Sequence, residues 1–328
     1  MPATGHRIAR AVFRACEIPG ASAPFDRLSL KIHYPALPDE SEEQRSAGVV
    51  AADTEGKPYP VVIVLPGINV GPEAYAWLAR PLAVQGYIVV TFTMIAEEMP
   101  GYVSLTPGLD LSAITPDSYG TRPSATAIAP ILACLDEVNK AGVLDGCINT
   151  DEVLLVGHSA GGSVALFNAS ADWFPGVRGA VAYGAHSGAS TALGFAEGTI
   201  LELPSDQPLL LIGGTRDGVI AGSASRYGES VGDSLGRMRQ TFLNGVTAGR
   251  KDCYLAEING ANHFSFAYPE DDSTGRAFLD MPEEADGEAL RQLFAEMIIA
   301  FADNAVGREA TDLMSFAEHD LVSGMRCR

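Results

Sequence analysis

Residues 153–165 read Val-Leu-Leu-Val-Gly-His-Ser-Ala-Gly-Gly-Ser-Val-Ala, an apolar run that enters a Gly-x-Ser-x-Gly pentapeptide and leaves it through small residues. This order predicts a buried strand, a sharp turn and a helix, the context in which such a serine acts as a nucleophile. We expect Gly157 and Gly161 to lie too close to neighbouring backbone for a side chain. The turn would strain the backbone of Ser159 and place its hydroxyl at the carboxyl edge of a sheet, beside a helix N-terminus.

Apolar runs and helical patterns alternate on both sides of this stretch. Runs typical of buried parallel strands occupy residues 61–65, 87–92, 179–183, 208–214 and 253–258, and we expect 253–258 to be the last strand. Helical spacing marks residues 72–85, 124–140, 238–243 and 288–306. Residues 8–18 and 26–34 alternate apolar and polar side chains, which indicates antiparallel edge strands. Together these patterns predict an α/β fold with a mostly parallel central sheet and helices on both faces.

The length of 328 residues fits a single domain over residues 1–328, with a core at about 25–305. Residues 36–58 are rich in Pro, Glu and Ser, and we expect a solvated loop there. Long loops inside compact domains are usually lids or binding loops. Three segments are therefore candidate lid elements over the site: 95–121, 185–206 and 221–250.

Composition and charge exclude several classes of partner. A hydrophobic fraction of 47% with 19% charged residues is typical of a globular protein. The net charge of −19 would repel phosphate backbones and anionic membrane surfaces, so nucleic acid is not an expected partner. Residues 1–20 lack the apolar core of a signal peptide, and no run is long enough to cross a bilayer. We expect a cytoplasmic protein, for which a homodimer remains open.

The cysteines give no sign of a metal site. Five are present at positions without metal-ligand spacing, and buried or inert thiols are the favoured interpretation. Cys253 and Cys327 would form a disulfide near the C-terminus only if the protein were exported. Neither a metal nor an organic cofactor is expected.

Three residues at predicted strand ends have the chemistry of a nucleophilic site. Ser159, Asp217 and His263 follow three strands in this order, and the carboxyl ends of parallel strands share one edge of the sheet. A serine hydroxyl becomes a good nucleophile when a neutral imidazole accepts its proton, which is the role expected for His263. Asp217 would hold the imidazole in the correct tautomer and stabilise the imidazolium.

Other residues compete less well for these roles. Asp151 lies at the start of its strand, which is the wrong edge, and His158 is expected to pack beneath the turn. Glu202 and Asp206 stay open as alternative acids because the position of Asp217 at a strand end is itself inferred. The histidines without a supporting motif are His6, His33 and His319.

The segment after the strand at 61–65 reads Pro-Gly-Ile-Asn-Val-Gly at residues 66–71. A glycine-containing turn there would aim the backbone N–H of Ile68 into the site. The N–H of Ala160, which directly follows the nucleophile, would supply the second donor of an oxyanion hole.

Several of these segments together resemble the dienelactone hydrolase-related branch of the α/β-hydrolases, and within it bacterial cutinases and polyester hydrolases, chlorophyllases and platelet-activating-factor acetylhydrolase-like esterases. The resemblance spans residues 25–305 and rests on residues 66–71 through 87–90, 157–162, 212–217 and 260–264. It implies an α/β-hydrolase fold, the triad Ser159, Asp217 and His263, the oxyanion pair Ile68 and Ala160, and no cofactor.

Departures from the family pattern bear on the substrate. Dienelactone hydrolases proper use a cysteine nucleophile, whereas this chain has Ser159. Polyester hydrolases usually carry an aromatic residue where Ile68 stands and a tryptophan near His186, and neither aromatic is present. We therefore expect a covered apolar pocket for a modest-sized ester, with Val219 and Ile220 in its wall and His186 beside it.

The sequence predicts a serine carboxylic-ester hydrolase that acts on a small to medium ester through an acyl-enzyme. A thioesterase, an amidase or a chlorophyllase-like enzyme would use the same residues. An inactive binding protein that keeps the hydrolase fold is the alternative from another class, although a binding role does not need all three of Ser159, Asp217 and His263.

Overall fold

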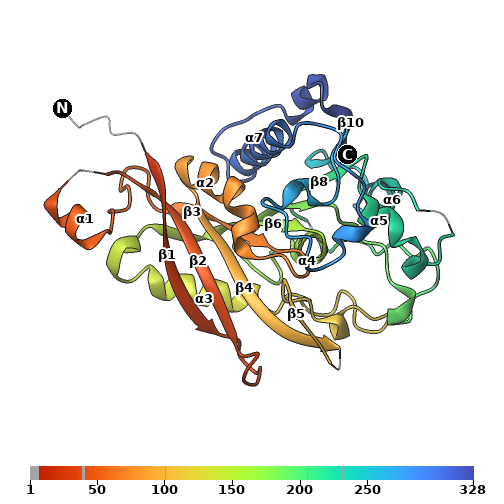
Figure 1. Cartoon of the computed structure of the whole chain (residues 1–328), viewed down its shortest axis with the longest axis horizontal. Coiled ribbons are helices and arrows are strands. Elements are labelled where there is room, and N and C mark those ends of the chain that lie inside the picture. Colours follow the sequence, from red (N-terminus) through yellow and green to blue (C-terminus); the bar gives the residue numbers. More distant parts are fainter. Residues whose placement is uncertain (1–6, 39–40, 100, 205, 231) are drawn as a thin grey trace.

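The computed structural model describes residues 7–38, 41–99, 101–204, 206–230 and 232–328, and its centre is one large twisted sheet (Figure 1). The strands follow the order β1-β2-β4-β3-β6-β7-β8-β9-β10, and β5 pairs with β4 outside this path. Their bounds are β1 Ile8–Glu17, β2 Arg27–Ala36, β3 Tyr59–Leu65, β4 Ile88–Met99, β5 Tyr102–Leu105, β6 Ile148–His158, β7 Val177–Tyr183, β8 Leu209–Gly214, β9 Cys253–Ile258 and β10 Val322–Cys327.

The middle of the sheet is parallel. Strands β4, β3, β6, β7, β8 and β9 pair side by side in parallel, whereas β1, β2 and β10 join antiparallel at the two edges. Every residue of β3 and of β8 is buried, because helices cover both faces of these strands. Parallel pairing brings the carboxyl ends of the central strands to one edge, where the loops after them meet.

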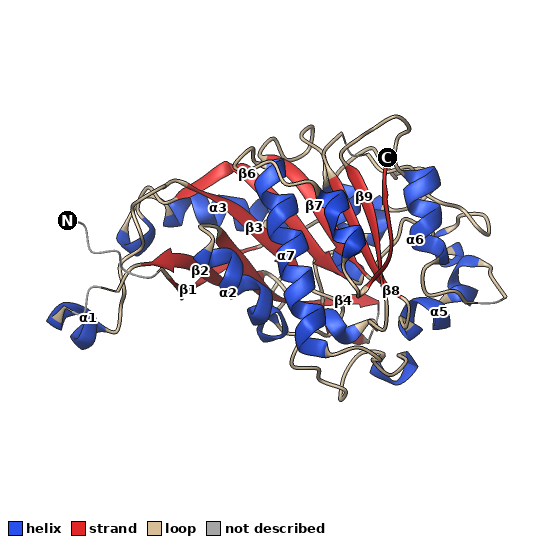
Figure 2. Cartoon of the chain, turned by 90° about the horizontal axis from the view of Figure 1, so that it is seen from above, coloured by secondary structure: helices blue, strands red, loops and turns tan. Residues whose placement is uncertain are grey.

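Helices form a layer on each face of the sheet. On one face α2 (Ala76–Val84) and α7 (Gly287–Ala305) bury Leu78, Leu82, Leu290 and Met297 in one apolar cluster, and Figure 2 shows α7 lying across the strands. On the opposite face α3 (Ile128–Val138) and α4 (Ala160–Asn168) contribute Ile131, Leu135, Val164 and Leu166 to a second cluster. The predicted fold class, α/β with a mostly parallel sheet and helices on both faces, is confirmed.

The remaining helical segments are short and lie mainly in the connections. They are α1 Glu42–Ala47, α5 Gly218–Gly222 and α6 Gly236–Gln240, the 3₁₀ turns η1 Pro72–Tyr75, η2 Leu111–Ala113, η3 Gly142–Leu144, η4 Thr191–Leu193, η5 Ala224–Tyr227, η7 Phe264–Phe266, η8 Ala277–Leu279 and η9 Leu313–Glu318, and a π-helical turn η6 Thr241–Gly245.

Part of the predicted lid segment 95–121 is a β-hairpin and not a loop. Strand β4 runs on past residue 92 to Met99, and β5 folds back on it through Gly101, which has a φ of 78°. Backbone pairing between the two strands satisfies the polar groups of this extension, whose exposed Ile95 and Val103 have strand-forming side chains. The hairpin thus extends the sheet beyond the predicted strand.

Residues 36–58, predicted to be a loop, contain helix α1. The Ser41 hydroxyl accepts a hydrogen bond from the N–H of Gln44, and Gly48 ends the helix in the left-handed conformation with a φ of 65°. A serine cap before the helix and a glycine after it are local signals that stabilise even a short helix. Residues 39–40 of this segment lie outside the described residues.

Strand β9 was expected to end the sheet, but β10 pairs with it in antiparallel orientation. The residues of β10 are all half-buried or exposed, so apolar and polar side chains alternate only weakly along this strand. The register places Cys327 opposite Tyr254, so the side chains of Cys327 and Cys253 point to opposite faces of the sheet. The disulfide considered between these two cysteines is therefore wrong for this fold, and both are free thiols.

Candidate active site

The predicted turn after β6 has the strained geometry that its sequence requires. Ser159 has a φ of 55° and a ψ of −122°, and α4 begins at the next residue, Ala160. A non-glycine residue in this region is held there only when its surroundings determine the conformation. The N–H of Ser159 donates to the carbonyl of Tyr183 on the neighbouring strand β7, which anchors the turn to the sheet.

Glycines let the turn pack backbone against backbone. A Cβ built on Gly161 would lie 2.1 Å from the carbonyl oxygen of Leu65, and one built on Gly157 would lie 2.1 Å from the carbonyl oxygen of Gly161. These distances leave no room for any side chain. Because Leu65 is the last residue of β3, the close approach holds the loop after β3 directly beside Ser159.

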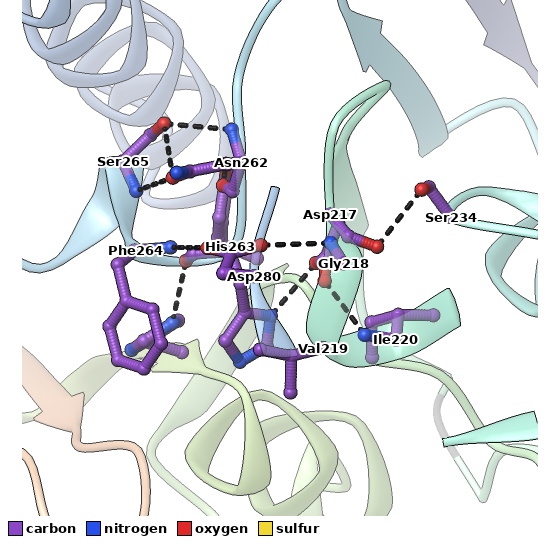
Figure 3. Close-up of polar contacts among 12 residues, drawn as sticks. Asp217, Gly218, Val219, Ile220, Ser234, Asn262, His263, Phe264, Ser265 and Asp280 are labelled. Carbon is purple, nitrogen blue, oxygen red and sulfur yellow. Dashed lines mark hydrogen bonds and ion pairs between the residues drawn. The ribbon is translucent and has the colours of Figure 1, made fainter. Parts of the chain in front are cut away.

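Asp217 and His263 form a buried hydrogen-bonded pair (Figure 3). Asp217 follows β8 and caps α5: its Oδ1 accepts from the N–H of Ile220 at 2.8 Å, while its Oδ2 lies 2.8 Å from Nδ1 of His263. An ionised carboxylate only accepts hydrogen bonds, so Nδ1 of His263 carries the hydrogen and Nε2 of the neutral ring has a free lone pair. The ring therefore has the tautomer that a general base requires.

Gly184, just after β7, provides the space for this pair. Its φ is 57°, and a Cβ at this position would lie 2.9 Å from Nδ1 of His263 and 3.1 Å from Oδ2 of Asp217. Among the described residues, the hydroxyl of half-buried Ser159 makes no hydrogen bond. It is thus not held by another protein group.

The two backbone N–H groups predicted to form an oxyanion hole are also unused. Among the described residues, neither the N–H of Ile68 nor that of Ala160 donates to a protein acceptor, whereas the N–H groups of Gly67 and Asn69 both do. Ala160 is the first residue of α4, where N–H groups lack intrahelical partners. This arrangement can stabilise an anion, and the role of the two N–H groups as an oxyanion hole stays a prediction.

A buried network that the sequence did not reveal links the oxyanion loop to the base. The N–H of Gly67 donates to the Tyr75 hydroxyl at 2.9 Å, the hydroxyl lies 3.0 Å from Nδ1 of His158, and Nε2 of His158 lies 3.0 Å from the carbonyl oxygen of His263. Burial lowers the pKa of His158 well below its usual value, so the ring is neutral.

The donor and acceptor roles in this network follow from its two ends. The carbonyl of His263 can only accept, so Nε2 of His158 carries the hydrogen and Nδ1 must accept from Tyr75. His158 packs beneath the turn, as its sequence position suggested, and it also fixes the backbone of His263. Tyr75 had no sequence signal beyond helical spacing, because its partner His158 is distant in the chain.

Asp280 is a second residue that the sequence analysis missed. Its Oδ1 accepts from the N–H of Gly218 at 2.8 Å, and its Oδ2 accepts from the N–H of Phe264 at 3.1 Å (Figure 3). These two residues directly follow Asp217 and His263. No motif surrounds Asp280, so only the fold shows that it contacts both loops.

The predicted substrate-binding residues lie on the same edge of the sheet but make different contacts. His186 is buried: its Nδ1 accepts from the N–H of Gly188 at 3.0 Å, and burial and the nearby Arg237 lower its pKa to about 3. Val219 and Ile220 lie in the first turn of α5, directly after the acid. Their contribution to a substrate pocket stays a prediction.

The structure brings Asp217, and neither alternative acid, into contact with His263. Glu202 and Asp206 are both exposed, and Asp206 precedes β8 at its amino end. The remaining candidates, which take no part in the hydrogen bonds of the pair, are Asp151, His33 and His319, while His6 lies outside the described residues.

The loops around this edge interlock. Asn69 beside the oxyanion loop accepts from the N–H of Leu105 on the hairpin, and Thr274 donates to the carbonyl of Asn69. The segments 185–206 and 221–250 are also linked, because the N–H of Gly198 in the first donates to the carbonyl of Tyr227 in the second. Residues 268–281, not considered as a lid element from the sequence, therefore also border the site.

Two cavities lie near these loops. One of about 540 Å³ is bordered by Tyr119, Ile200 and Leu203, and one of about 430 Å³ by Phe264, Tyr268 and Arg291. Ser159 borders neither cavity, so their volumes do not measure the space for a substrate. Within the described ranges, no three His, Cys, Asp or Glu side chains are grouped to hold a metal ion, and no helix is long and apolar enough to span a membrane.

Comparison with known proteins identifies one family. Residues 62–324 match the family model described as the alpha/beta hydrolase family. A search of curated proteins finds no significant match. The matched region begins in β3 and reaches β10, and it includes the turn at Ser159, Asp217 and His263.

Replacement of Tyr75 by Phe tests the buried network. The change leaves the N–H of Gly67 and Nδ1 of His158 without a partner in a buried site, so we expect the free energy of unfolding to fall by about 3 kcal/mol in urea denaturation. Tyr34→Phe is the matched control, because it removes a hydroxyl whose acceptor is the half-buried carbonyl of Val50. An equal loss in both variants would contradict the network.

The buried histidines predict how stability depends on pH. Burial lowers the pKa of His33 to about 4, of His186 to about 3 and of His158 well below its usual value. Below pH of about 6.5 the unfolded chain therefore binds protons that the folded chain does not, and the free energy of unfolding decreases as pH falls. Each histidine contributes a slope of up to about 1.4 kcal/mol per pH unit.

Urea denaturation between pH of about 6.5 and 5.5, above the range in which most carboxylates titrate, measures this slope. His186→Gln should reduce the slope by roughly one third, because it removes one of three titrating groups. Stability that stays constant or rises as pH falls through this range would show that these rings are not neutral in the folded protein.

Proposed function

The chain belongs to the alpha/beta hydrolase family, and from this membership we propose that it is a serine hydrolase that cleaves a carboxylic ester through an acyl-enzyme on Ser159. The observation that carries the proposal is the buried hydrogen bond between His263 and Asp217, at the sheet edge where the strained turn presents Ser159. The family supports hydrolysis in general, and these three residues support the serine mechanism.

In the first half of the reaction, Oγ of Ser159 attacks the ester carbonyl carbon while Nε2 of His263 takes the hydroxyl proton. The carbonyl π electrons move to oxygen, and the N–H groups of Ile68 and Ala160 bind the resulting oxyanion. Asp217 stabilises the imidazolium through its hydrogen bond to Nδ1. The intermediate then expels the alcohol, which receives the proton from His263, and leaves an acyl group on Ser159.

In the second half, water attacks the acyl carbon and gives its proton to Nε2 of His263. Collapse of the second tetrahedral intermediate breaks the bond to Oγ, which recovers its proton, and releases the carboxylic acid. No cofactor is needed, because each proton that leaves one oxygen returns to another through the same ring.

We propose a small to medium ester as substrate, consistent with the resemblance to the dienelactone hydrolase-related branch. Ile68 stands where polyester hydrolases usually carry an aromatic residue, and the tryptophan that they usually carry near His186 is absent. The hairpin that contains Leu105 and the segment that contains Thr274 both bind Asn69 beside the oxyanion loop. Elements on two sides of the loop favour an enclosed pocket over an open groove for a polymer.

Labelling of Ser159 tests the mechanism. A fluorophosphonate should add one label to this serine, and Ser159→Ala should lower kcat for p-nitrophenyl butyrate by roughly 10⁴-fold or more, because the nucleophile is lost. Ser163→Ala is the control, since Ser163 lies one turn later on the same helix and donates to the carbonyl of His186. An active Ser159→Ala enzyme, or a label at another serine, would refute the proposal.

A series of p-nitrophenyl esters tests the substrate class. We expect kcat/KM to be highest for acyl chains of about two to six carbons and to fall for longer chains, because an enclosed pocket rejects excess length. Thioesters and amides of the preferred acyl group, assayed alongside, separate ester hydrolysis from the related activities. Highest kcat/KM for long acyl chains, or release of soluble products from a solid polyester, would contradict an enclosed pocket.

A further inference from the structure

Asp280 connects the two loops that carry the acid and the base. One oxygen of its carboxylate accepts from the N–H of Gly218, and the other accepts from the N–H of Phe264 (Figure 3). Gly218 directly follows Asp217, and Phe264 directly follows His263. One side chain therefore binds the backbone at the residue after each member of the pair.

Both N–H groups belong to the first turns of short helices. Asp217 is the cap of α5, and His263 precedes the 3₁₀ turn η7. The first N–H groups of a helix have no intrahelical partner, so they need an acceptor from elsewhere. A carboxylate is the strongest acceptor among the side chains for such groups, and here one carboxylate serves two helices.

The chain around Asp280 is fixed on both sides. A Cβ on Gly218 would lie 2.4 Å from the carbonyl oxygen of Leu279, so α5 packs directly against this segment. On the other side, Nδ2 of Asn262 donates to the carbonyl of Met281 at 2.8 Å. The carboxylate of Asp280 is thus held at one place relative to both loops.

Asp280 also adds a negative charge beside the pair. Burial and the charge of Asp217 raise the pKa of Asp280 above its usual value, while its hydrogen bonds from backbone N–H groups and the nearby His263 oppose this rise. Among the described residues, ionisable groups near His263 and Asp280 include His158, Tyr183, Glu270 and Glu283. Of these, burial keeps His158 and Tyr183 neutral, and Glu283 accepts from the hydroxyl of Ser265.

We propose that Asp280 is a positioning residue of the active site: it sets the geometry between Asp217 and His263 through the backbone of both loops, and its charge favours the imidazolium that forms during catalysis. This inference rests on the proposed function, because it assigns Asp280 a part in the same reaction. It extends that function by a residue that touches neither the substrate nor the reacting atoms.

Asp280→Asn is the principal test. Asparagine keeps the size of the side chain but replaces one acceptor oxygen by an NH₂ group and removes the charge. Glu284→Gln is the matched control, since it removes a charge from the same segment, where Glu284 is exposed and pairs with Arg216 at 3.2 Å. Asp280→Glu keeps the charge and alters the reach of the carboxylate.

We expect Asp280→Asn to lower kcat for p-nitrophenyl butyrate by about tenfold or more with KM changed by less than about threefold, because substrate contacts are intact. The midpoint of the acidic limb of the kcat/KM profile should move to lower pH by about 0.5 unit, since loss of a neighbouring negative charge disfavours the protonated ring. Asp280→Glu should lower kcat without shifting the midpoint of the acidic limb. Glu284→Gln should have the kcat and the acidic-limb midpoint of the wild type.

A readout without turnover keeps this test separate from the proposed function. The far-downfield proton resonance of a His Nδ1–H bonded to a carboxylate can be observed in the wild type and assigned by its loss in Asp217→Asn. In Asp280→Asn this resonance should shift, and the midpoint of its pH dependence should fall, whereas Glu284→Gln should leave both unchanged. These signals remain informative even if the protein hydrolyses no ester.

Three results would overturn the inference. The first is an Asp280→Asn protein with wild-type kcat and an unmoved acidic limb. The second is a loss of activity that only parallels a lower Tm, with the limb and the proton resonance unchanged, because a purely structural role predicts this. The third applies if Asp280→Asn does not fold, and it is an Asp280→Glu protein with the kcat of the wild type. Failure of the wild type to bind fluorophosphonate would refute the proposed function alone.

Discussion

The close approach of Gly161 to the carbonyl of Leu65 is the constraint on which the site depends. It fixes the start of α4 against the end of β3, and so it brings the loop that contains Ile68 beside Ser159. Any side chain at this glycine would separate the two elements, because the atom that it meets belongs to backbone and cannot move aside. The strain at Ser159 is maintained by the same packing.

Buried polar groups then connect the parts that this packing brings together. Tyr75 and His158 form a continuous path from the N–H of Gly67 to the carbonyl of His263. Each polar group in this path has a hydrogen-bond partner, so its burial leaves no donor or acceptor unpaired. The neutral state of His158 matters here, since a charged ring would also carry a hydrogen on Nδ1, which could then no longer accept from Tyr75.

Residues 280–281, in the carboxyl-terminal part of the chain, hold the loops that contain Asp217 and His263. Asp280 binds the backbone after the acid and after the base, and Asn262 binds the carbonyl of Met281 in return. A short loop alone would leave His263 free to move, because loops are the more mobile parts of a fold. Here the loop of the base is held by groups from β6 beneath it and from residues 280–281 beside it.

The sequence by itself determined the elements whose signals are local. Continuous apolar runs identified the central parallel strands, because burial on both faces requires apolar side chains at every position. The pentapeptide around Ser159 identified the turn, and the order of strand ends placed Asp217 and His263 at the same edge as Ser159. The fold class is confirmed, and Asp217 contacts His263. The assignment of the three residues to one site and their chemical roles stay predictions.

Only the tertiary structure decided the features that depend on distant partners. Strand β10 is weakly patterned and forms because β9 offers an unpaired edge, and the β4–β5 hairpin continues a strand into a segment that composition alone marked as a loop. Tyr75 and Asp280 act through hydrogen bonds to residues 83 and 62 positions away, respectively. A local sequence pattern does not reveal such contacts, because they depend on which distant segments the fold brings together.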